Sequence, residues 1–262
     1  MSGAPASLAE PTPAAPPPQA PSEPSRVPAL LIKALAVYSA VVVSLIAVAV
    51  LVGSSDPRER AIILMALGLI AIWVVVGGII QLRIRDRVRE RVLAIPRGWQ
   101  LKFVLFATAL LLLEEVVSTG MTNLAPLLGS ERGVAYITAS DNYFLVIAFH
   151  SVSVLFPAYI GWAWLLKRYD FTPNEVFLLY GLLGTTAEAM LNPTSLIAGF
   201  WFFIYGLMIY LPAYSLPRDR GAVRPRPKHY VLTYFVPLAC QIPAVIVVTL
   251  LRGALGIKLF TG

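Results

Sequence analysis

Seven long apolar segments, separated by short polar ones, dominate the pattern of the chain. They lie near residues 29–53, 61–82, 103–124, 144–166, 176–191, 194–214 and 230–251. A helix needs about 20 residues to cross the hydrocarbon core of a membrane. The pattern therefore predicts an all-α bundle of seven transmembrane helices.

Proline positions refine the ends of two of these segments. The fifth segment is short and stops at Asn192-Pro193, a turn signal that predicts a tight hairpin with the sixth. The third segment is followed by residues 124–129, which contain Pro126 and predict that its outer end breaks or re-enters the membrane.

The first 28 residues lack any hydrophobic periodicity and contain nine prolines. Such a segment cannot bury enough apolar surface to offset the entropy lost on ordering. We therefore predict two regions, a disordered cytoplasmic tail over residues 1–28 and a transmembrane helical domain over residues 29–262.

Composition supports the same class of protein. Of the 262 residues, 58% are hydrophobic and 13% are charged, whereas a soluble domain carries about 25% charged residues. This excludes an ordinary soluble enzyme. Cys240 is the single cysteine, which excludes a disulfide-stapled secreted module.

The net charge of +7 comes from loops between the apolar segments. Three basic segments, 83–102, 167–168 and 218–228, hold 16 of the 21 Lys and Arg residues together with Arg26 and Lys33. Seven spans place all three on one side, as the positive-inside rule requires. We predict a multi-pass protein of the cytoplasmic membrane, with a cytoplasmic N-terminus and an external C-terminus. Nucleic acid is not expected as a partner, because no aromatic residues interleave with these charges.

Four ionisable residues lie inside the predicted spans: Glu114, Glu115, His150 and Glu188. With a rise of about 1.5 Å per residue, all four lie roughly 16–21 Å from the cytoplasmic boundary. Gln241 lies at nearly the same depth in the last span. Such groups are costly in a membrane and mark functional sites, so we predict that they meet in one polar layer.

The third span carries a polar stripe that must face other helices rather than lipid. Gly181 and Gly184 in the fifth span permit close helix packing, which would bring Glu188 near this stripe. The stripe comprises Glu115, Thr119 and Asn123 at a spacing of four, with Glu114, Ser118 and Thr122 one residue earlier.

Several uses of the layer remain open from the residues alone. A carboxylate beside a histidine can act as general base on water, with Glu114, Glu115, His150 and Glu188 as the catalytic candidates. Glu115, His150 and Glu188 could hold a divalent metal, although no HExxH motif is present and the sequence requires no cofactor. Chains of Glu and His also relay protons. A structural alternative is that these groups form hydrogen bonds between helices.

The segment Glu114-Glu115-Val116-Val117-Ser118-Thr119-Gly120, followed by His150, resembles the CAAX-protease and bacteriocin-processing family of intramembrane peptidases. The resemblance covers residues 103–165 and implies a water molecule, activated by Glu and His, that cleaves a peptide bond within the bilayer. Thr119 stands where the family has arginine. The family's late His and Asn motif has no counterpart here.

Three functions follow as hypotheses. The first is an intramembrane peptidase-like protein, the second a small proton- or ion-coupled transporter, and the third a non-catalytic membrane subunit. The expected partners are membrane lipids and a membrane-embedded peptide or protein. Thr119, Asn123 and Gln241 are expected to support the polar site.

Overall fold

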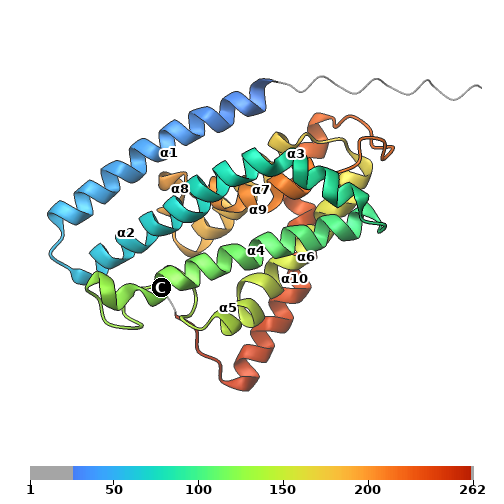
Figure 1. Ribbon diagram of the computed structural model, residues 1–262. Coiled ribbons are helices and arrows are strands. Elements are labelled where there is room, and N and C mark those ends of the chain that lie inside the picture. Colours follow the sequence, from blue (N-terminus) through green and yellow to red (C-terminus); the bar gives the residue numbers. More distant parts are fainter. Residues whose placement is uncertain (1–25, 261–262) are drawn as a thin grey trace, which may run out of the picture.

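The computed structural model describes residues 26–260, and within this range the chain is helical with no β-strand (Figure 1). The predicted tail, residues 1–28, lies outside the described residues except for its last three, which belong to the first helix. The helices are α1 (Arg26–Gly53), α2 (Pro57–Leu69), η1 (Ile70–Gly77), α3 (Gly78–Ala94), α4 (Trp99–Asn123), η2 (Ala125–Leu128), α5 (Tyr143–Phe149), α6 (Ser151–Arg168), α7 (Pro173–Leu191), α8 (Ser195–Ala198), α9 (Trp201–Tyr214) and α10 (Pro227–Leu255).

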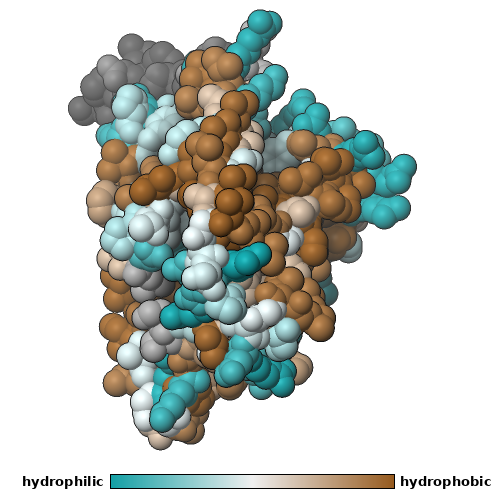
Figure 2. Space-filling view, turned by 90° about the vertical axis from the view of Figure 1, so that its left-hand side faces the viewer, coloured by the Kyte–Doolittle hydropathy of each residue, from teal (hydrophilic) through white to brown (hydrophobic). Residues whose placement is uncertain are grey.

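Three of the described helices are long and apolar enough to cross a membrane: α1, the continuous helix Pro57–Ala94 and α10. A fourth is counted if α5 and α6, which meet at an angle of 43°, form one bent span. Many large apolar side chains on these helices are exposed, and hydrophobic residues cover much of the face shown in Figure 2. The fold therefore suits a membrane protein.

The centre of the bundle is formed by α4, α6, α7 and α9. Helix α7 packs most closely on α9, α6 packs on α10, and α4 lies against both α6 and α9. The side chains of Tyr159, Trp162 and Tyr180 are fully buried in this core. In Figure 1, α1 runs along one edge of the molecule, and it contacts α2, α7 and α8.

The second apolar segment continues further than the sequence predicted. Residues 83–94, expected in a basic loop, are helical and extend the helix from Pro57 to Ala94. Its middle, η1, is a π-helix in which Trp73 donates a hydrogen bond to the Ile204 carbonyl oxygen (3.1 Å). The extension has a simple cause, because residues 83–94 are good helix formers and Pro96 is the first proline after Pro57.

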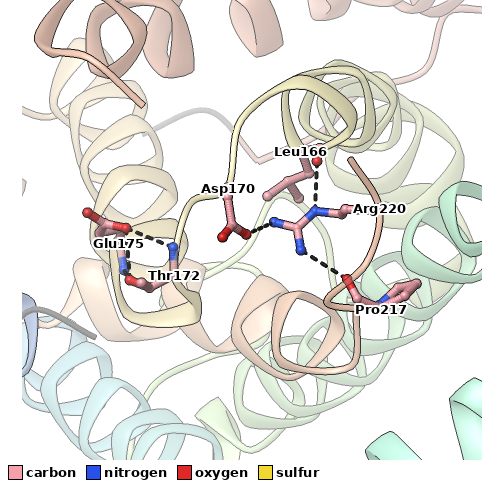
Figure 3. Close-up of polar contacts among 6 residues, drawn as sticks. All are labelled: Leu166, Asp170, Thr172, Glu175, Pro217 and Arg220. Atoms are coloured by element: carbon pink, nitrogen blue, oxygen red, sulfur yellow. Dashed lines mark hydrogen bonds and ion pairs between the residues drawn. The ribbon is translucent and has the colours of Figure 1, made fainter. Parts of the chain in front are cut away.

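The basic segments meet at one end of the molecule. The Tyr214 hydroxyl, at the end of α9, donates to Asp86 of α3 (2.5 Å). Arg220 joins the α9–α10 loop to the end of α6 and the start of the α6–α7 loop, through the Leu166 carbonyl oxygen and Asp170 (Figure 3). The α1–α2 turn and η2 lie at the other end, where Ala61 packs against Ala125.

Helix termini follow the local signals in the sequence. Helix α7 stops before Asn192, as predicted, and α4 stops at Asn123, before the 3₁₀ turn that contains Pro126. Asn142 caps α5 by accepting hydrogen bonds from the backbone N–H groups of Phe144 (3.0 Å) and Leu145 (3.4 Å). These ends set the positions of the polar side chains along α4, α5 and α7.

Candidate functional site

The polar stripe of α4 faces the interior of the bundle. Glu114 and Glu115 are each 5% exposed, and Ser118, Thr119 and Thr122 are buried beside them. Ser118 donates a hydrogen bond to the Glu115 carboxylate (3.2 Å). This agrees with the expectation that the stripe avoids lipid.

Glu188 is half-buried on α7 and accepts a hydrogen bond from the hydroxyl of Tyr205 on α9. Sequence reasoning missed Tyr205. Its ring packs directly against Gly184 of α7, where an added Cβ would lie 2.0 Å from the ring. The small residue on α7 thus permits the contact between Tyr205 and Glu188.

The three carboxyl groups form one cluster. Glu114, Glu115 and Glu188 are close enough for their charges to interact with one another. The buried hydroxyl of Tyr159 on α6 interacts electrostatically with Glu114 and Glu115. Charging several of these groups together is costly away from water, so the cluster is suited to holding protons.

His150 occupies a different place from the one that the sequence suggested. The predicted span 144–166 is interrupted at this residue, which separates α5 from α6 and has φ −138° and ψ −85°. The residue is exposed rather than enclosed in the layer. No proline or glycine marks the break, so the sequence carries no signal for it.

Ser151 connects His150 to the carboxyl cluster. Its Oγ lies 2.9 Å from His150 Nδ1, and its side chain also interacts with the Glu115 carboxyl group. Ser151 itself is buried. A hydroxyl can donate one hydrogen bond and accept another at the same time, so Ser151 is placed to connect His150 at the protein surface with Glu115 in the interior. Sequence reasoning missed Ser151, because a serine beside a histidine has no distinctive pattern.

The three supporting residues differ in their surroundings. Thr119 is buried, and its Oγ1 has no hydrogen-bond partner among the described residues. Asn123 instead binds the backbone carbonyl oxygens of Thr119 (2.9 Å) and Asp141 (2.8 Å), which ties the end of α4 to the following loop. Gln241 is buried on α10, and its place at the edge of the cluster stays a prediction.

Metal binding finds no support in the geometry. Within residues 26–260, no three His, Cys, Asp or Glu side chains are grouped as metal ligands. Glu115, His150 and Glu188, the set considered from the sequence, form no such group. The arrangement suits acid–base chemistry or proton transfer, in which a chain of hydrogen bonds moves a proton between groups.

Two substitutions of Glu188 separate hydrogen bonding from ionisation. Gln can still accept the hydrogen bond from Tyr205, so Glu188→Gln is expected to leave the melting temperature in detergent near that of the unmodified protein. Leu cannot accept this hydrogen bond, so the Tyr205 hydroxyl loses its partner in Glu188→Leu. We expect this variant to have a free energy of unfolding lower by about 1–3 kcal/mol. Equal melting temperatures for both variants would show that this hydrogen bond does not stabilise the α7–α9 pair.

No protein-family model, curated protein or solved structure matches this chain.

Proposed function

We propose that this chain is a seven-span protein of the cytoplasmic membrane in which a buried carboxyl cluster exchanges protons with the surface. The transport of protons, or of an ion coupled to them, is the function that this arrangement fits best. One observation carries the proposal, namely that Ser151 Oγ lies 2.9 Å from His150 Nδ1 and that Ser151 also interacts with the Glu115 carboxyl group.

The chain of three residues has the chemistry of a relay. When His150 donates from Nδ1, Ser151 accepts this proton and donates its own to Glu115. In the reverse state, a protonated Glu115 donates to Ser151, and Ser151 donates to His150. The two states differ only in which end holds the proton, and both ends are groups that gain and lose protons readily.

The experiment uses the full chain in liposomes that contain a pH-sensitive dye, with a membrane potential imposed by potassium and valinomycin. We expect proton uptake that falls at least about tenfold in Ser151→Ala and returns in Ser151→Thr, because Thr restores the hydroxyl. Thr108→Ala is the matched control, since the Thr108 hydroxyl bonds only to a carbonyl oxygen of its own helix. Uptake by Ser151→Ala equal to that of the unmodified protein would overturn the relay.

Peptide hydrolysis is the second candidate, and the same geometry favours it. Glu115 belongs to the segment that resembles the CAAX-protease family, and Ser151 links it to His150. Glu115 and His150 could therefore share the proton of an attacking water molecule. Cleavage of membrane-embedded peptides, lost in Glu115→Gln, combined with the absence of proton uptake, would favour this function. A chain with neither activity would be a non-catalytic subunit whose polar residues join its helices.

The proposed topology predicts a labelling pattern. Cysteines at positions 90 and 222, in a chain with Cys240 replaced by Ala, should react with an impermeant maleimide only from the cytoplasmic side. A cysteine at position 132 should react only from outside, because seven spans and the positive-inside rule place it there. Labelling of positions 90 and 132 from the same side would contradict both the predicted orientation of the chain and the predicted common depth of the polar residues.

A further inference from the structure

A cavity of about 600 Å³ lies between α1, α2 and the segment around α8. Its walls are apolar and come from α1 (Val43, Ile46, Ala47), from α2 and η1, and from the segment around α8, with Trp201 at the start of α9. From Ile62 to Ile70 it extends about 12 Å along the helix, which is most of one leaflet of a hydrocarbon core about 30 Å thick. Its size is within the range of about 300–1,000 Å³ found for small-molecule sites.

Helix α1 has few other contacts that hold it in place. Only Pro28, Ser39 and Ala47 of this 28-residue helix are buried. The Tyr38 hydroxyl donates to the Ile197 carbonyl oxygen (2.8 Å), beside the cavity. The remaining surface between α1 and α2 in this half of the helix borders the open space, so packing here is incomplete without an occupant.

The cavity is continuous with the surfaces that face lipid. Leu45 and Val48 on α1 and Leu64 on α2 are exposed apolar side chains next to its lining. Its polar lining includes Asn192 and Thr194. Asn192 follows the last residue of α7, about 28 Å from the start of that helix, which is the level where a hydrocarbon core ends and headgroups begin.

From these observations we infer that the cavity binds one acyl chain of a membrane phospholipid, which packs between α1 and α2. The chain fills the apolar walls, and the ester and headgroup lie at Asn192, whose side-chain NH2 group can donate to an ester oxygen while its Oδ1 accepts from Thr194 (2.7 Å). The lipid thereby fastens α1 to the bundle. This role is independent of any proton transfer at Glu115.

The first test is native mass spectrometry of the full chain in detergent, titrated with dioleoylphosphatidylcholine after delipidation. We expect one bound lipid at concentrations where other lipids are stripped away. Ala66→Phe places a ring in the cavity and should weaken this binding at least about tenfold. Ala71→Phe is the control, because Ala71 is exposed on the same continuous helix. Equal lipid binding by the two variants overturns the inference.

A second measurement does not require a bulkier side chain in the cavity. Phosphatidylcholine with brominated chains quenches tryptophan fluorescence on contact. The signal of Trp201, obtained by difference from Trp201→Phe, should be quenched at a lower fraction of brominated lipid in detergent than the signal of Trp164. Trp164 is 43% exposed and reports on lipid that coats the bundle. If Trp201 is quenched only together with Trp164, or after it, no acyl chain enters the cavity. If the protein retains added oleate but not added phosphatidylcholine, the occupant is not a phospholipid.

Discussion

Gly184→Ala is expected to lower the free energy of unfolding by about 3 kcal/mol, the upper part of the range for overpacked cores. A methyl group at this position would lie 2.0 Å from Cγ and 2.2 Å from Cδ2 of Tyr205. These atoms belong to the base of the ring, so turning the ring about its Cβ–Cγ bond cannot relieve the clash. Either α7 and α9 separate or Tyr205 leaves its rotamer. Thermal unfolding in detergent measures the effect.

The substitution has a matched control and a rescue. Gly120→Ala on α4 adds the same methyl group where no atom lies within 4 Å, and it should be neutral or slightly stabilising because Ala favours a helix. In a double-mutant cycle with Tyr205→Leu, the cost of Gly184→Ala should fall well below its cost in the unmodified protein. A cost that is independent of residue 205 would locate the strain elsewhere.

The same site shows what the sequence could predict. The small residues of the fifth segment predicted close packing near Glu188, and the four-residue spacing on the third segment predicted an inward polar stripe; the structure has both. These features depend on helix periodicity, which a sequence displays directly. The partner that Gly184 accommodates, Tyr205, could not be identified, because many aromatic residues surround it in the sequence and any of them could have filled that space.

The connection between His150 and Glu115 was beyond prediction for a different reason. Depth along a helix was inferred from a constant rise per residue, which assumes an unbroken helix. The break at His150 exposes this side chain and buries Ser151. Since neither proline nor glycine lies at the break, we attribute it to tertiary contacts such as the interaction between Ser151 and Glu115. Contacts of this kind are absent from local patterns.

Arg220→Ala is expected to destabilise the protein by about 3 kcal/mol, because one buried guanidinium joins segments far apart in the sequence. Its side chain is 5% exposed. It donates to the carbonyl oxygens of Leu166 (2.9 Å) and Pro217 (3.0 Å) and to the Asp170 carboxylate. Hydrogen bonds that involve a charged group contribute roughly 1.5–3 kcal/mol each, and the carbonyl groups left behind lose their partner. The melting temperature in detergent measures the loss, with exposed Arg218→Ala as the control.

The partners of Arg220 differ in how well water can replace the guanidinium group. Asp170 is 40% exposed, so water can solvate its carboxylate once the guanidinium is gone, and Asp170→Ala should cost less than half as much as Arg220→Ala. Arg220→Lys should be intermediate, because an ammonium group lacks the planar fork that reaches three acceptors in fixed directions. If Asp170→Ala proved as costly as Arg220→Ala, the ion pair would be the main link between these loops. If Arg220→Lys proved harmless, the charge would matter more than the geometry of the backbone hydrogen bonds.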